Sequence, residues 1–212
     1  MTQTVWLARH GNRLDFVQPE WFNRAKLRYD PPLSDDGLIQ AQKLAERLKT
    51  EQISQIFCSP FLRAIQTANE VAKILKLELQ LEAGLGEWHN PEWMSYSPKL
   101  HPPEFLAKQY PRINWDYKSL VIPHYPETES MVNQRTAKTA RLLVKKYYPK
   151  NILLVGHSAS VIGATKGLVG KEVEIKASLC CLVKLRLHYS LSKPSNQWIV
   201  ELNGDTSHLT NP

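Results

Sequence analysis

The sequence predicts an α/β fold in three layers, with a mostly parallel sheet covered by helices on both faces. Short apolar runs of strand length alternate along the chain with segments in which apolar residues recur at helical spacing. A chain of 212 residues that is 42% hydrophobic and 22% charged has an ordinary globular composition and enough length for a full core. We therefore predict a single domain over residues 1–212, with an insertion at about residues 88–126.

The first half of the chain predicts three strands and two long helices. Ser34 precedes two aspartates and then apolar residues at helical spacing, so we expect it to cap a helix. Ser59 and Pro60 predict a second helix start, because proline suits the first helical position, and this helix would reach about Leu75. Arg63 would then lie in its first turn. Apolar runs predict strands at residues 4–8, 55–58 and 79–82.

Residues 88–126 differ in composition from the rest of the chain. They contain seven of the 14 prolines, with three tryptophans and four tyrosines. Proline breaks regular elements, so we predict an irregular, aromatic-rich insertion. A long segment of this kind is often a lid, and its tryptophans would form either its own core or the wall of a substrate pocket.

The second half of the chain predicts a return to regular alternation. Apolar periodicity indicates a helix from about Thr128 to Tyr148 and another from Ser158 to Leu168. A strand at residues 152–155 lies between them. Two closing strands are expected near residues 179–187 and 197–202.

Charge and cysteine content restrict the classes of partner. The net charge of +7 favours anionic ligands such as phosphate esters, but lysine and arginine are scattered, so we expect no nucleic-acid partner. Cys58, Cys180 and Cys181 form no metal or disulfide pattern and resemble small buried hydrophobes. We see no signal sequence and no apolar stretch of the roughly 18 residues that a membrane span needs. We expect a cytoplasmic protein without a membrane partner, and the sequence predicts no oligomeric state.

Two histidines directly follow two of the predicted strands. His10 lies between Arg9 and Gly11 after the first strand, and His157 follows the strand at residues 152–155. Side chains at the carboxyl ends of parallel strands share one crevice, so the two histidines are expected to meet. Glycine permits tight turning and close ligand approach, and arginine offers a planar donor fork for phosphate oxygens. The pattern indicates a site for a phosphoryl group.

Arg63 and Glu87 complete a constellation for phosphoryl transfer. An imidazole could attack phosphorus, arginines could hold the anion, and a carboxylic acid could protonate the leaving group. The attacking nitrogen of His10 must be unprotonated, so a partner such as a backbone carbonyl near Gly11 should fix its tautomer.

These motifs resemble the histidine phosphatases, also called the phosphoglycerate mutase-like superfamily. Four motifs in the family's order are far more specific than any one tripeptide. The resemblance covers most of the chain. Arg13, the run Asp30–Ser34 and the pair Glu87-Trp88 are most similar to the branch that contains the suppressor of T-cell-receptor signalling phosphatases. The matching pieces are Leu7–Gly11, Pro32–Ser34 with Gly37, Ser59–Ala68, Glu87 and Val155–Ser158.

The resemblance implies a phosphoglycerate mutase-like fold and a role for each candidate residue. His10 would be the nucleophile, and Glu87 would be the proton donor, a role that needs a raised pKa. His157 would be a cation that donates a hydrogen bond to a phosphate oxygen. The phosphate ligands implied are Arg9, Arg63 and His157, with Arg13, Asn12 and Ser158 as further candidates.

The combined pattern predicts a metal-independent phosphomonoester hydrolase that forms a phosphohistidine and needs no cofactor. Its substrate would be a phosphorylated small molecule or a phosphopeptide. A cofactor-dependent phosphoglycerate mutase would use the same constellation, but this chain has Arg13 and Phe16 where such mutases typically carry serine or threonine and asparagine. A non-catalytic phosphate-binding module is the third reading, disfavoured because all the core side chains are present.

Overall fold

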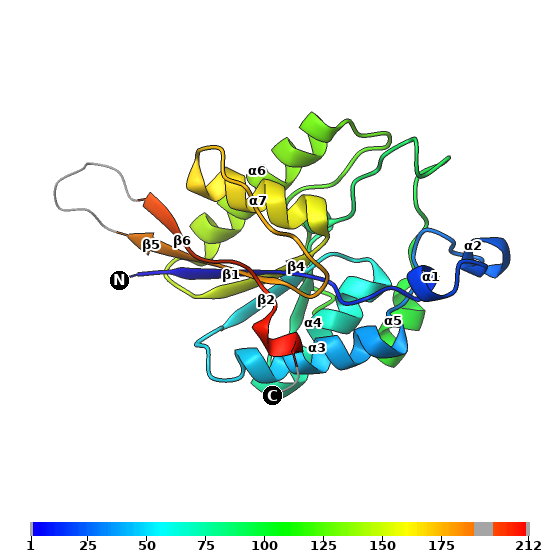
Figure 1. Cartoon of the computed structure of the whole chain (residues 1–212), viewed down its shortest axis with the longest axis horizontal. Coiled ribbons are helices and arrows are strands. Elements are labelled where there is room, and N and C mark those ends of the chain that lie inside the picture. Colours follow the sequence, from blue (N-terminus) through cyan, green and yellow to red (C-terminus); the bar gives the residue numbers. More distant parts are fainter. Residues whose placement is uncertain (1, 189–196, 211–212) are drawn as a thin grey trace.

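A six-stranded mixed sheet forms the centre of the computed structural model, which describes residues 2–188 and 197–210 (Figure 1). The strand order is β3-β2-β4-β1-β5-β6, in which the first four strands are parallel to one another, while β5 pairs antiparallel with both β1 and β6. The predicted α/β class is confirmed. The strands are β1 Thr4–Arg9, β2 Gln55–Cys58, β3 Leu79–Leu81, β4 Ile152–Gly156, β5 Leu182–His188 and β6 Gln197–Asp205.

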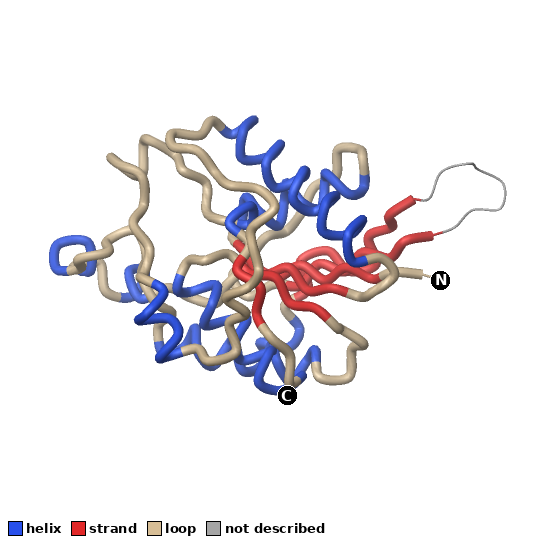
Figure 2. The backbone as a smooth tube through the Cα atoms, turned by 180° about the vertical axis from the view of Figure 1, so that it is seen from behind, coloured by secondary structure: helices blue, strands red, loops and turns tan. Residues whose placement is uncertain are grey.

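Helices cover both faces of the sheet, as Figure 1 shows from one side and Figure 2 from behind. Side chains alternate along a strand, so Trp6 and Ala8 of β1 pack with α3 and α4, while Val5 and Leu7 pack with α6 and α7. Strand β1 is therefore buried on both faces. The helices are α3 Asp35–Leu48 and α4 Leu62–Leu75 on one face, with α6 Glu129–Tyr147 and α7 Ser158–Val169 on the other.

Three of the four predicted helix starts are confirmed, that of α7 at Ser158 among them, and one is wrong. Ser34 caps α3 by accepting a hydrogen bond from the Gly37 amide, and Thr128 caps α6. Helix α4 begins at Leu62 instead of at Ser59-Pro60, because a distant carboxylate, Asp30, accepts the Leu62 amide at 2.7 Å. The Ser59 hydroxyl accepts the Phe61 amide at 3.3 Å, before the helix begins.

The segment at residues 88–126 is mainly irregular, as predicted, with one unpredicted helix, α5 Pro103–Gln109. Its ends are tied together, because the Glu127 amide donates to the His89 carbonyl at 2.9 Å. Short elements that the sequence did not indicate are the helices α1 Leu14–Val17 and α2 Trp21–Arg24 and the 3-10 turns η1 Ala83–Leu85 and η2 Ser207–Leu209.

The three cysteines are free and buried, as their apolar surroundings predicted. Burial raises the pKa of the Cys58 thiol, so it is protonated at neutral pH. Within residues 2–188 and 197–210, no helix is both long and apolar enough to cross a membrane.

Candidate active site

Strand register places the two histidines side by side at the carboxyl ends of β1 and β4. Arg9 of β1 pairs with Gly156 of β4, so the next residue of each strand is a histidine at the same level. The ring centroids of His10 and His157 are 5.1 Å apart, and both side chains are buried. The predicted meeting of residues far apart in sequence thus follows from parallel pairing.

Hydrogen bonding assigns one tautomer to His10. Its Nδ1 lies 2.7 Å from the Gly11 carbonyl oxygen, which can only accept, so Nδ1 carries the proton and Nε2 keeps its lone pair. Burial lowers the pKa of His10 well below its usual range, and the nearby Arg63 cation lowers it further. A neutral imidazole with a free Nε2 is the form that can attack phosphorus.

Gly11 is required by the packing of two backbones. A Cβ at Gly11 would lie 2.6 Å from the Gly37 carbonyl oxygen in the first turn of α3. The sequence suggested that this glycine permits close approach of a ligand, but the close approach here is that of helix α3. The Gly11 amide also donates to the Thr67 hydroxyl at 3.1 Å, which ties the loop after β1 to α4.

Arg63 connects the other charged groups of the site. From the first turn of α4, its Nε donates to Nε2 of His10 at 3.3 Å, and its Nη2 lies 3.0 Å from Oε2 of Glu87. Burial lowers the pKa of Arg63 to about 10, which still leaves it charged at neutral pH. The guanidinium is 1% exposed, so its charge is poorly screened by water.

The protonation states of Glu87 and His157 differ from those the sequence predicted. Burial alone would raise the pKa of Glu87, but the hydrogen bond with Nδ1 of His157 and the Arg63 cation bring the pKa well below its usual range. Burial lowers the pKa of His157 to about 4, so this ring is neutral at pH 7 rather than cationic. Its Nδ1 lies 3.1 Å from Oε2 of Glu87, and its Nε2 lies 2.8 Å from the Ser59 hydroxyl. The assigned state is an ionised Glu87 beside a neutral His157.

A buried ion pair holds the loop that carries Glu87. Arg135 of α6 donates to both carboxylate oxygens of Glu127, at 2.6 and 2.7 Å. The same guanidinium donates to the backbone carbonyls of Gly84, Gly86 and Glu87 at 3.0 to 3.2 Å. Sequence reasoning missed this clamp, because Arg135 lies 48 residues beyond Glu87 and one arginine among many carries no local signal.

Three other glutamates, Glu82, Glu92 and Glu127, have other surroundings in the structure. Glu82 accepts hydrogen bonds from the Tyr117 hydroxyl and from backbone amides, and Glu127 is paired with Arg135. Glu92 is exposed on the insertion. Glu87 is therefore the acid that the fold brings to the two histidines.

A cavity of about 460 Å³ opens over this cluster. Arg9, Arg63 and Glu87 line it together with the further candidates Arg13 and Ser158. Arg9 donates from Nη1 to the Ala177 carbonyl at 2.8 Å, while its buried Nε has no partner among the described residues. Arg9 therefore contributes a positive charge to the wall of the cavity, which suits an anionic ligand.

Two of the weaker candidates have partners within the protein. Nε and Nη2 of Arg13 donate to the two oxygens of the Asp15 carboxylate, and its guanidinium lies 4.5 Å from the centre of the Phe16 ring. The Asn12 amide donates to Asp36 at 2.8 Å and accepts from the Arg13 amide, and Asn12 does not line the cavity. A phosphate-binding role would require Asn12 to give up these bonds.

An apolar side cavity of about 200 Å³ adjoins the main one. Glu87, Trp93 and Ser158 line both cavities, and Trp88 and Ile162 line the smaller one. Trp88 and Trp93 contact each other edge to face, with centroids 5.0 Å apart. These tryptophans therefore form walls beside the candidate acid.

Local charge favours an anion at this site. The possible ligand atoms of His10, Glu87 and His157 lie within 4.8 Å of one another, a spacing that a metal ion could use. However, Arg63 contacts all three groups, and Arg9 lies in the same cavity. A metal cation here would be repelled by these arginines, whereas a phosphate would be attracted.

The fold and the cluster define an α/β protein with a two-histidine, arginine-rich site at the carboxyl ends of its parallel strands. The chain belongs to the histidine phosphatase superfamily (branch 1), which residues 5–193 match. The family resemblance of the four motifs is therefore confirmed at the level of the superfamily.

Several curated proteins are similar to this chain. The transcription factor tau 55 kDa subunit of Saccharomyces cerevisiae is 32% identical, over 98% of this chain and 52% of its own length. Human ubiquitin-associated and SH3 domain-containing protein B is 28% identical, over 78% of this chain and 31% of its own. The chain thus spans about half of the first relative and a third of the second. The probable phosphoglycerate mutase GpmB of Photorhabdus laumondii is 30% identical, over 98% of this chain and 95% of its own.

Among solved structures, the fold is similar to that of the ecdysone phosphate phosphatase from Bombix mori, solved with tungstate. The TM-score is 0.77 at 22% identity, over 95% of this chain and 93% of the other. This likeness concerns the fold, and it agrees with the predicted phosphoglycerate mutase-like architecture.

Proposed function

We propose that this protein hydrolyses phosphomonoesters through a phosphohistidine at His10. The observation that carries the proposal is the state of His10, whose Nδ1 is fixed by the Gly11 carbonyl and whose Nε2 is left unprotonated beside Arg63. A buried neutral nucleophile next to cations is the arrangement that attack on a phosphate ester requires.

The proposed reaction has two steps. Nε2 of His10 attacks phosphorus, and Arg63 exchanges its hydrogen bond with His10 for bonds to phosphate oxygens, which Arg9 and His157 also contact. The ester oxygen leaves with a proton from Glu87, which acts here in its protonated form, and the population of this form grows as pH falls. In the second step Glu87, now ionised, takes a proton from water as this water attacks the phosphohistidine, which restores His10 and releases inorganic phosphate.

Phosphoglycerate mutation is the second candidate, favoured by the 30% identity to a probable phosphoglycerate mutase. Against it, Phe16 lines the cavity where a mutase needs donors for its substrate's carboxylate. Incubation with 3-phosphoglycerate and catalytic 2,3-bisphosphoglycerate should release inorganic phosphate slowly or not at all and form little 2-phosphoglycerate. Formation of 2-phosphoglycerate faster than phosphate release from every ester in a phosphomonoester panel would instead establish a mutase.

A non-catalytic role is the third candidate, and the 32% identity to a transcription factor subunit supports it. Such a protein would retain phosphate binding on this fold but give no burst of phosphohistidine with any substrate. The intact set of His10, Arg63, Glu87 and His157 supports an enzyme instead. The 28% identity to ubiquitin-associated and SH3 domain-containing protein B supports a place in the branch that the sequence motifs suggested.

The pH dependence of kcat/KM should have an acidic optimum, with kcat/KM falling as pH rises above the ordinary pKa of a glutamate, about 4.3. Glu87 must be protonated to act as the acid, and since its pKa is lowered, its protonated fraction grows as pH falls below 7. His10 must be unprotonated, and since its pKa is lowered too, it stays so in mild acid. The measurement is kcat/KM for an alkyl phosphate between about pH 4 and pH 8, corrected for ionisation of the ester near pH 6. An optimum at neutral or alkaline pH would contradict these roles.

A further inference from the structure

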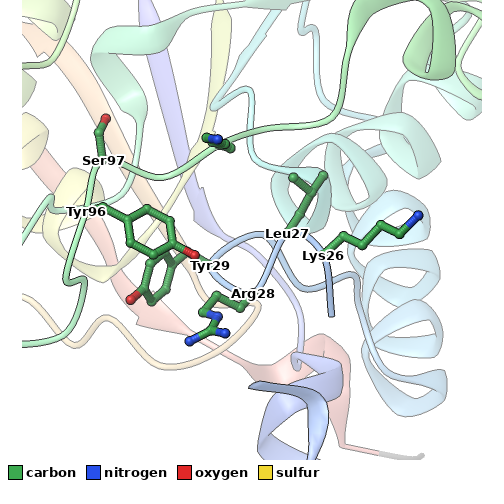
Figure 3. A pocket seen from close by; sticks show the side chains of 7 residues that line it. Lys26, Leu27, Arg28, Tyr29, Tyr96 and Ser97 are labelled. Carbon is green, nitrogen blue, oxygen red and sulfur yellow. The ribbon is translucent and has the colours of Figure 1, made fainter. Parts of the chain in front are cut away.

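A second cavity, of about 490 Å³, lies beside the catalytic one and shares Tyr29 with it (Figure 3). Two segments form its walls, residues 26–29 before Asp30 and residues 96–99 of the insertion. The insertion also reaches the catalytic cavity, through Trp93 and Met94. One pair of chain segments therefore lines two neighbouring cavities.

Tyr29 joins the two segments and forms the boundary between the cavities. Its hydroxyl accepts a hydrogen bond from the Ser95 amide at 3.0 Å and lies 3.0 Å from the Ser95 hydroxyl. Its ring packs on Tyr96, with centroids 5.0 Å apart. The backbone carbonyl of Tyr29 lies 3.5 Å from Nη1 of Arg63. The boundary is thus fixed in position relative to the arginine that is proposed to bind phosphate.

The second cavity is cationic. Lys26, Arg28 and Lys99 line it, no acidic residue does, and none of the three has an ion-pair partner among residues 2–188 and 197–210. In Figure 3 the guanidinium of Arg28 lies near the rings of Tyr29 and Tyr96, whereas Lys26 points away from them. Three unpaired cations around one hollow repel one another and attract an anion of high charge.

We propose that this cationic subsite, formed by Arg28 and Lys99 with Tyr29 and Tyr96, binds a second anionic group of the substrate. The inference rests on the proposed function and specifies its substrate class, a phosphomonoester with a second phosphate at its far end. The scissile phosphate would lie over His10 while the chain between the phosphates passes Tyr29.

The test compares linear alkanediol monophosphates with the corresponding bisphosphates over a series of chain lengths. The wild-type protein should prefer one length of bisphosphate by about tenfold in kcat/KM, the gain expected from two partly exposed ion pairs. In the double variant Arg28→Ala with Lys99→Ala, the preference should fall to the statistical factor of about two for two equivalent phosphates. The control Lys138→Ala with Lys145→Ala removes the same charge from exposed positions on α6 and should keep the preference.

The outcomes separate the subsite from the proposed function. If esters are hydrolysed but the bisphosphate has no advantage at any length, or the control loses it equally, the subsite is wrong and the hydrolase proposal stands. If no ester is hydrolysed, the hydrolase proposal fails, and calorimetric binding to His10→Ala tests the subsite alone. The subsite would be supported if His10→Ala binds bisphosphate more tightly than monophosphate and if this difference disappears when Arg28 and Lys99 are also replaced by alanine. Equal affinities would overturn it.

Discussion

Replacement of His10 by alanine should abolish turnover, a loss of at least about 10⁴-fold. No other group in the site offers an unprotonated nitrogen at this position, because Nδ1 of His157 faces Glu87 and its Nε2 faces Ser59. The arginines are untouched, so the variant should still bind inorganic phosphate, which calorimetry would detect. His188→Ala is a matched control. His188 is the last residue of β5, which is antiparallel to β1, so it lies at the end of the sheet away from the site, and the variant should retain full activity.

The covalent intermediate gives a direct assay of the same assignment. When the wild-type protein reacts with labelled substrate and the reaction is quenched rapidly without acid, His10 should carry a base-stable, acid-labile label. A label on His157, or a variant at His10 that still turns over, would show that the nucleophile has been assigned to the wrong ring.

Replacement of Glu87 by glutamine should lower kcat by about 100-fold or more for esters with poor leaving groups. The amide keeps the shape of the side chain but has no acidic proton to give. A good leaving group such as nitrophenolate needs little protonation, so its rate should fall much less. The basic limb of the pH profile should flatten in this variant, since the titrating acid has been removed.

A control variant and a comparison of leaving groups show whether Glu87 is an acid or only a positioning group. Glu92→Gln, on the exposed surface of the insertion, should behave as the wild type. An equal loss for all leaving groups in Glu87→Gln would mean that the carboxylate orients Arg63 and His157, which it contacts at 3.0 and 3.1 Å, and does not transfer a proton.

Much of the fold could be predicted because the signals are local. Alternating apolar periodicity defined the strands and the long helices, and Ser34 marked the start of α3 by a cap that needs only three residues. The start of α4 could not be predicted in this way. There Asp30, 32 residues away, supplies the cap, so a tertiary contact replaced the local signal of Ser59 and Pro60.

The identity of the site residues was likewise available from the sequence, since His10, Arg63, Glu87 and His157 belong to motifs at predicted strand and helix ends. Their protonation states were not. The pKa of Glu87 is lowered rather than raised, and His157 is neutral rather than cationic, because each depends on burial and on charges within a few ångströms. The Arg135–Glu127 clamp could not be predicted either, because it joins residues that only the tertiary structure brings together.

The sequence by itself determined the order of the strands and of the four long helices and the start of three of these helices, because hydrophobic spacing and capping act over a few positions. Tertiary structure alone decided which charges became neighbours. Parallel pairing of β1 with β4 placed two histidines together, and packing of residues 26–29 against the insertion placed a cationic cavity beside them. These are contacts between distant segments, and their energies depend on distance and burial that no local pattern encodes.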